Sequence, residues 1–201
     1  MANKSTIDNN FPNLVRSSQI NSYFCGPATL QMLLSFYDVD IDQQQVVDCL
    51  GINDKIINYG TTIQELGTFI KDLYPQYQFW YKFHSTTAEL SQIINELKYP
   101  VGVEWQGIFD YPDDEINEDE DDDPGHLAVI TGINTSKNYI YIADPDAHYA
   151  GKDRQFSILQ FERRWWDINE IKHQEIDDYH GLFLITPSTI TLPDSLLFLK
   201  P

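Results

Sequence analysis

The chain has few cysteines, few basic residues and no long apolar run. Its 201 residues include two cysteines, Cys25 and Cys49, and 13 lysines and arginines against 31 aspartates and glutamates. Two cysteines are too few for a disulfide scaffold, which favours a reducing compartment, so we expect a cytoplasmic protein. No apolar run approaches the roughly 18 residues that span a bilayer, and residues 1–18, an irregular lead-in, lack the apolar stretch of a secretory signal. The formal net charge of −18 repels nucleic acid and anionic membranes, so we expect neither as a partner.

Much of the negative charge lies in one segment. Ten of the fourteen residues from Asp110 to Asp123 are carboxylates, and the remainder of the chain carries a formal charge of about −8, which is ordinary for a soluble domain. We interpret the segment as a solvated loop within an insertion at residues 106–124. Calcium binding is an alternative, but the EF-hand pattern fails because Pro124 stands where its glycine should be. A third interpretation is a loop that borders a cleft and attracts basic substrates.

The order of apolar patterns predicts the fold class. A hydrophobic fraction of 42% is enough for the core of one domain, which we assign to residues 1–201 with a tail at 187–201. Helical spacing or capping residues predict helices over 26–37, 41–50, 62–74, 85–98 and 157–166. Short apolar runs predict strands over 77–83, 101–105, 126–133, 139–145 and 181–186. Helices come first and strands mostly later, which predicts an α+β fold with an N-terminal helical part packed on a mostly antiparallel sheet.

Cys25 stands directly before the Gly-Pro at which the first helix is expected to begin. The thiolate is the nucleophilic form of cysteine, and a helix N-terminus favours an anion through its unpaired N–H groups and its dipole. Gly26 has no side chain and would leave room for a substrate backbone. The alternative is a buried apolar filler, which is the role we expect for Cys49 at the end of an amphipathic helix. Nothing in the sequence supports a disulfide between the two.

A thiolate nucleophile needs a base, and two of the five histidines are candidates. His126 opens the apolar run HLAVITGI, and His180 precedes the apolar run GLFLI. We prefer His126, because the residues after His180 contain only Asp194 as a carboxylate and no second strand of matching pattern.

A hairpin register then selects a partner for His126. If its turn centres on Thr135, residues whose numbers sum to 270 face each other, and Asp144 lies opposite His126. A carboxylate there would hold the tautomer and the orientation of the imidazole. A turn centred on Ser136 would instead place Asp146 opposite, so Asp146 is the rival orienter.

Acyl transfer also needs donors for the developing oxyanion. The backbone N–H of Cys25 is one candidate. Gln19, six residues earlier, could deliver its side-chain amide across the intervening loop. The alternative is that Gln19 is an ordinary loop glutamine.

Four motifs in this order resemble the papain-like cysteine peptidases: Gln19, the run CGPA from Cys25, the run GHLAVI from Gly125, and Asp144-Pro145. The match is closest to the bacteriocin-processing peptidases, which cleave leader peptides after a double glycine, and to their stand-alone relatives. The resemblance spans roughly residues 14–186 and implies the papain-like fold. It implies Cys25 as nucleophile, His126 as base, Asp144 as orienter, and Gln19 with the Cys25 amide as the oxyanion hole.

We therefore expect a cysteine peptidase that hydrolyses a peptide or isopeptide bond in a peptide or protein substrate. The resemblance implies no cofactor, and we assign no metal ligands. Two alternatives remain open. One is an acyltransferase or peptide ligase that uses the same thioacyl chemistry, and the other is a catalytically inactive, peptidase-like binding protein. The acidic insertion before Gly125 is not part of the family pattern, and the sequence predicts no oligomeric state.

Overall fold

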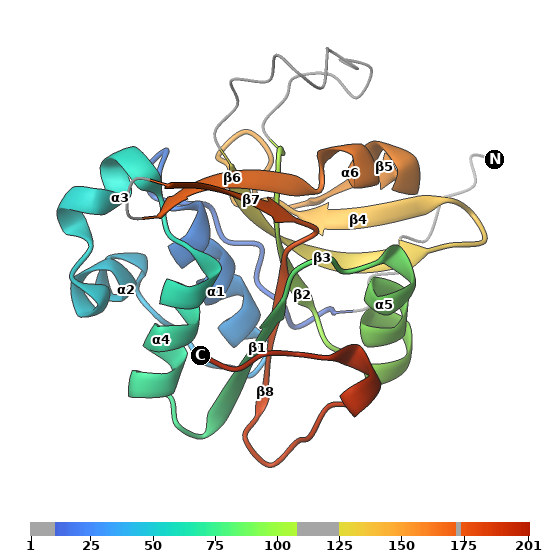
Figure 1. Ribbon diagram of the computed structural model, residues 1–201, viewed down its shortest axis with the longest axis horizontal. Coiled ribbons are helices and arrows are strands. Elements are labelled where there is room, and N and C mark those ends of the chain that lie inside the picture. The colour runs from blue at the N-terminus through green and yellow to red at the C-terminus, as the bar shows by residue number, and fades with distance from the viewer. Residues whose placement is uncertain (1–10, 108–124, 172–173) are drawn as a thin grey trace.

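Helices precede strands along most of the chain, as the pattern predicts. The structure, a computed structural model, describes residues 11–107, 125–171 and 174–201. Within these ranges, residues 168–171 and 174–178 are described by their backbone alone. The three interpretations of the acidic segment Asp110–Asp123 therefore lie outside the described residues. Figure 1 shows α1 to α4 gathered at one side of the molecule and α5 and α6 at the other.

The N-terminal helices begin and end where their capping residues stand. They are α1 (Cys25–Ser35), α2 (Gln43–Leu50), α3 (Asn53–Tyr59) and α4 (Ile63–Leu73). Asp42 caps α2 by accepting a hydrogen bond from the Gln45 N–H, and Gly51 ends it with φ of 67°, which glycine adopts without strain. Thr62 and Glu65 form a capping box at the start of α4. The seven-residue α3 has no side-chain cap, and the sequence did not predict it.

A six-stranded antiparallel sheet forms the other part of the fold. Its order is β1-β8-β2-β3-β4-β5, and β6 and β7 form a separate two-stranded sheet. The strands are β1 (Tyr77–Lys82), β2 (Val101–Trp105), β3 (His126–Asn134), β4 (Tyr139–Ala143), β5 (Asp153–Ser157), β6 (Trp166–Ile171), β7 (Gln174–Tyr179) and β8 (Leu182–Pro187). The predicted helix at 85–98 is α5 (Thr87–Ser91) followed by a π-helical segment η1 (Gln92–Leu97), and α6 spans Ile158–Arg164.

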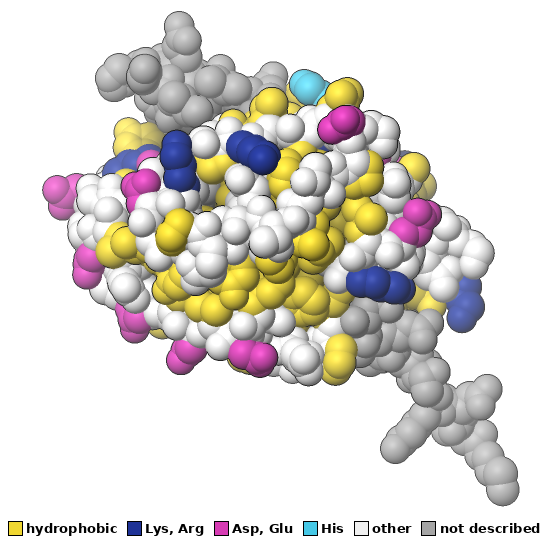
Figure 2. Space-filling model, turned by 90° about the horizontal axis from the view of Figure 1, so that it is seen from below, with side chains coloured by type: hydrophobic (Ala, Val, Ile, Leu, Met, Phe, Trp, Pro, Cys, Tyr) yellow, Lys and Arg dark blue, Asp and Glu magenta, His cyan; other side chains and the backbone are white. Residues whose placement is uncertain are grey.

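The core lies between α1, α4 and the sheet. Apolar residues of α1 and α4, among them Leu30, Leu33 and Phe69, belong to the same buried cluster as Val103 and Val129 of the central strands. Burial of this kind stabilises a fold by roughly 1.5–3 kcal/mol for each large apolar side chain. Figure 2 shows further hydrophobic side chains gathered on the face seen from below, with charged side chains spread around them.

The C-terminal tail packs on the rest of the domain. Leu199 exchanges backbone hydrogen bonds of 2.8 and 3.1 Å with Tyr81. This isolated bridge satisfies the N–H and C=O groups of Tyr81 on the outer edge of β1, which would otherwise be unpaired. A short 3₁₀ turn, η2 (Asp194–Leu196), precedes this contact.

Cys49 is exposed near the end of α2, so its assignment to the core was wrong. The apolar face of that short helix is formed by Val46 and Val47, both buried, and Cys49 lies outside it. Both cysteines are free thiols, which excludes the disulfide between them.

Candidate functional site

The nucleophile candidate opens the first helix. Cys25 is the first residue of α1, one position earlier than predicted, and only 7% of its surface is exposed. At Gly26 a Cβ atom would lie 2.9 Å from the side chain of Thr61 and 3.5 Å from that of Leu127. The missing side chain at position 26 therefore permits close packing of the helix start against Thr61, whereas the sequence suggested room for a substrate.

The base candidate lies at the first residue of β3, and its ring is buried. His126 lies opposite Trp105 of β2 in the strand register. Its Nε2 atom is 2.7 Å from Oδ1 of Asp144. Burial by itself would lower the pKa of His126, but the hydrogen bonds to Asp144 and Cys25 outweigh it and raise the pKa to about 10. The imidazole is then protonated at neutral pH, with Nε2–H donating to Asp144 and Nδ1 left for Cys25.

Asp144 accepts hydrogen bonds on both carboxylate oxygens. Oδ1 accepts from His126 and, at 2.9 Å, from the backbone N–H of Asp146, and Oδ2 accepts from Nη1 of Arg154. Burial by itself would raise the pKa of Asp144. The hydrogen bond from His126 and the positive charges of His126 and Arg154 hold it below its usual range. Asp144 is therefore a carboxylate at neutral pH.

The predicted register of the hairpin was wrong, although the side chains of His126 and Asp144 are in contact. Val129 faces Ala143, two positions from the predicted partner, and a bulge between Ile130 and Gly132 shifts the rest of the ladder further. A continued ladder would place Asp146 opposite His126, but β4 ends at Ala143. His126 and Asp144 are thus diagonal neighbours, which are still within reach of long side chains.

Asp146, the rival orienter, and His180, the rival base, make other side-chain contacts. The carboxylate of Asp146 accepts from the backbone N–H of His148 at 2.9 Å and lies 2.8 Å from its ring nitrogen. His180 has Nδ1 2.9 Å from the carbonyl oxygen of Ser85, and its ring stacks on Trp165 at 4.7 Å. The side chains of both residues are thus engaged outside the Cys25–His126–Asp144 cluster, while the backbone N–H of Asp146 donates to Asp144.

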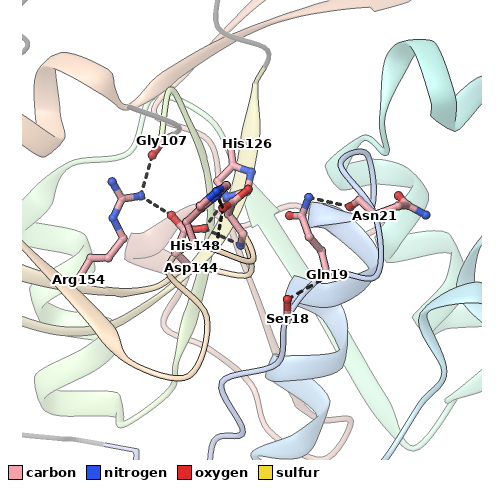
Figure 3. A network of polar contacts seen from close by, with 9 residues as sticks. Ser18, Gln19, Asn21, Gly107, His126, Asp144, His148 and Arg154 are labelled. Atoms are coloured by element: carbon pink, nitrogen blue, oxygen red, sulfur yellow. Dashed lines mark hydrogen bonds and ion pairs between the residues drawn. The ribbon is translucent and has the colours of Figure 1, made fainter. Parts of the chain in front are cut away.

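Gln19 is buried beside this cluster. Its backbone N–H donates to the carbonyl oxygen of Pro145 at 2.7 Å, which ties the loop before α1 to the loop that carries Asp144. Its Nε2 donates to the carbonyl oxygen of Asn21 at 2.8 Å, so the amide retains a second N–H for another acceptor. Figure 3 shows Gln19 and Asn21 on one side of the His126–Asp144 pair and Arg154 on the other.

A buried glutamine that the sequence did not predict holds the backbone around Gln19. Gln43, the first residue of α2, accepts from the N–H of Ile20 at 3.1 Å and donates to the carbonyl oxygen of Ser18 at 2.9 Å. Its Nε2 also lies 2.9 Å from Oε1 of Gln31. Gln43 therefore bonds the peptide groups on both sides of Gln19. Only the three-dimensional fold brings these residues together, so no local sequence signal identifies Gln43.

Gly125 packs against a carboxylate of the neighbouring hairpin. A Cβ atom at Gly125 would lie 2.0–2.1 Å from the carboxyl group of Asp167, the second residue of β6. Asp167 is buried, and its Oδ1 accepts from Nε2 of Gln106 at 3.2 Å. Glycine before His126 leaves this carboxyl group in place, because a side chain at position 125 would overlap it unless one of the two shifted.

Within the described ranges, no group of three or more histidine, cysteine, aspartate or glutamate side chains is arranged to hold a metal ion. The search for membrane-crossing helices, made over the same part of the chain, found none of sufficient length and apolar character.

Comparisons with known proteins agree with the fold. The model of the Peptidase_C39 like family matches residues 9–173. The peptidase domain of Streptococcus ComA, described as a bi-functional ABC transporter in a quorum-sensing pathway, is 19% identical with a TM-score of 0.58. That match covers 86% of this chain and 97% of the ComA domain. A double-glycine-motif protease from an AMS/PCAT transporter, solved with its leader peptide, is 16% identical with a TM-score of 0.52, covering 85% and 89%.

Comparison with curated proteins gave no match. The structural matches confirm the predicted α+β, papain-like peptidase fold, in which an N-terminal helical part packs on an antiparallel sheet.

Proposed function

The chain belongs to the Peptidase_C39 like family, and on that premise we propose that it is a cysteine peptidase. In this proposal Cys25 is the nucleophile, His126 is the acid and base, and Asp144 orients His126. The observation that carries the proposal is the buried row of Cys25, His126 and Asp144, in which hydrogen bonds raise the pKa of the imidazole to about 10. A protonated imidazole beside a thiol stabilises the thiolate, and the thiolate is the nucleophile.

The proposed reaction uses these groups in sequence. The Cys25 thiolate attacks the carbonyl carbon, and the oxyanion accepts hydrogen bonds from the Cys25 N–H and the second N–H of Gln19. His126 gives its proton to the leaving amine as the C–N bond breaks, which leaves a thioester on Cys25. The neutral imidazole then takes a proton from water, whose oxygen attacks the thioester and releases the acid.

The substrate is proposed as a peptide or protein. The AMS/PCAT protease was solved with a leader peptide, and cleavage after a double glycine is the first specificity to test for this chain. We keep the cytoplasm as the proposed location, since the thiol chemistry needs Cys25 reduced and both cysteines are free in the structure.

Alkylation rates of the two cysteines test the proposal within one molecule. Iodoacetamide at pH 7, followed by mass spectrometry of tryptic peptides, is expected to modify the buried Cys25 at least about tenfold faster than the exposed Cys49, because only Cys25 lies beside an imidazolium. A peptide library that includes double-glycine sequences then gives the cleavage preference, with Cys25→Ser as control and added amines to detect acyl transfer. A Cys25 rate no higher than that of Cys49 would contradict an activated thiol.

Loss of the Gln43 hydrogen bonds should slow turnover without slowing alkylation. Gln43→Met keeps the size of the side chain but leaves the Ser18 and Ile20 peptide groups without their partner, so Gln19 loses its fixed position. We expect kcat to fall about tenfold, since loss of one oxyanion donor costs about 10²–10³ and here the donor is displaced. Alkylation involves no oxyanion and should keep its rate. Gln45→Met on the exposed face of α2 is the matched control, and equal losses in both assays would indicate general disruption.

A further inference from the structure

An arginine with a largely buried side chain completes the row of charged side chains at the site. Arg154, on β5, donates from Nη1 to Oδ2 of Asp144 and, at 2.7 Å, to the carbonyl oxygen of Gly107. Its side chain is 9% exposed. The sequence predicted no strand at this position and gave no reason to connect Arg154 with His126.

Aromatic rings hold the guanidinium in place. Its central carbon lies 3.7 Å from the ring centroid of Tyr149, 4.8 Å from that of Phe156 and 5.6 Å from that of Trp105. An aromatic face attracts a cation, and a planar guanidinium stacks on it better than an ammonium does. The position of the charge is therefore fixed by packing as well as by hydrogen bonds.

The positive charge of Arg154 balances the negative charges of the row that includes the Cys25 thiolate. In the reactive state, the thiolate of Cys25 and the carboxylate of Asp144 are negative and the imidazolium of His126 is positive. These three groups alone would leave one uncompensated negative charge in a buried site, which is costly. Arg154 supplies the second positive charge, so that the signs alternate along the row.

Arg154 also fixes the orientation of the Asp144 carboxyl group. A carboxyl group that turned about its Cβ–Cγ bond would lose the alignment of Oδ1 with Nε2 of His126. Arg154 holds Oδ2, and the backbone N–H of Asp146 also donates to Oδ1, so both oxygens are fixed. A fixed carboxylate keeps the imidazolium ring pointed at Cys25.

We propose that Arg154 is a positioning residue for the reaction, which acts through Asp144 by holding its carboxylate ionised and oriented towards His126. This inference rests on the proposed peptidase function. Besides the charged members of the row, the ring of Tyr149 lies against the guanidinium. The carboxylate of Asp146 binds His148 instead.

The test compares three variants by the pH dependence of Cys25 alkylation and of peptide cleavage. In Arg154→Met the acid limb of both profiles should move to higher pH by about one unit, because Asp144 keeps its proton longer without the cation. Arg154→Lys keeps the charge but loses the planar fork, so it should retain the acid limb of the wild type and lose about fivefold in kcat. Lys152→Met removes an exposed charge two residues away and should match the wild type.

The outcomes separate this inference from the proposed function. If wild-type Cys25 is alkylated no faster than Cys49, the peptidase proposal itself fails. If wild-type Cys25 is fast and folded Arg154→Met has an unmoved acid limb, the role of Arg154 is overturned. If Arg154→Met does not fold, Arg154→Lys decides the matter, because a kcat equal to that of Lys152→Met would contradict positioning by the guanidinium.

Discussion

Replacing His126 with alanine is expected to lower kcat/KM for a cleaved peptide by about 10³-fold, within the range of general acid–base catalysis combined with loss of the thiolate partner. The substitution removes both the imidazolium that stabilises the Cys25 thiolate and the proton for the leaving amine. Alkylation of Cys25 should therefore fall to the rate of Cys49 in the same experiment. His148→Ala is the matched control, because that ring is 87% exposed and contacts Asp146.

The pH dependence of folding provides a second measurement on the same variant. The pKa of His126 is raised from 6.5 to about 10 in the folded protein, so the folded state binds the proton more tightly than the unfolded state. Its stabilising contribution is fully present below about pH 6.5 and is lost as the pH rises through about 10. An unfolded cysteine releases its own proton near about pH 8.5, so from about pH 6.5 to 8.5 the unfolded chain binds as many protons as a folded imidazolium–thiolate pair. Urea unfolding of the wild type from about pH 8.5 to about pH 10 should therefore show a decline in the free energy of unfolding that His126→Ala lacks. An equal decline in both proteins, with full activity in the variant, would contradict the role of His126.

Two candidate residues of the site could be proposed from sequence signals in their own neighbourhood. A helix start marks Cys25, and an apolar strand start marks His126. Asp144 was selected by a register that assumed a regular hairpin, and the actual ladder contains a bulge and lies two positions away. Asp144 still contacts His126, because β4 ends at Ala143 and the chain then turns the Asp144 side chain towards the imidazole. The observed register of β3 and β4 alone would place Asp146 opposite His126.

Residues that act through long-range contacts could not be predicted in this way. Gln43 and Arg154 reach the site from α2 and β5, and neither lies near a motif. The helix α3 and the strand β5 are short, and a segment of five to seven residues carries too few periods to be recognised. The strands β6 and β7 are rich in carboxylates, which are uncommon in strands, so their sequence did not indicate a hairpin.

Gly125→Ala is expected to lower kcat by about 100-fold, because small displacements of a catalytic group have effects of about that size. The added Cβ would lie 2.0–2.1 Å from the buried carboxyl group of Asp167. That carboxyl group or the start of β3 therefore has to shift, and His126 is the next residue. Overpacking of this kind also costs about 1–3 kcal/mol of stability. The measurements are kcat per folded molecule and urea unfolding.

Gly102→Ala separates the two effects. Its Cβ would overlap the ring of Phe183 at 2.3 Å in the middle of β2, remote in sequence from Gly125 and His126. We expect a loss of stability of similar size, about 1–3 kcal/mol, with kcat per folded molecule near that of the wild type. A second substitution, Asp167→Ala, should restore part of the activity of Gly125→Ala by removing the overlapping carboxyl group. If Gly125→Ala loses stability but keeps its kcat, the position of His126 does not depend on the contact between Gly125 and β6.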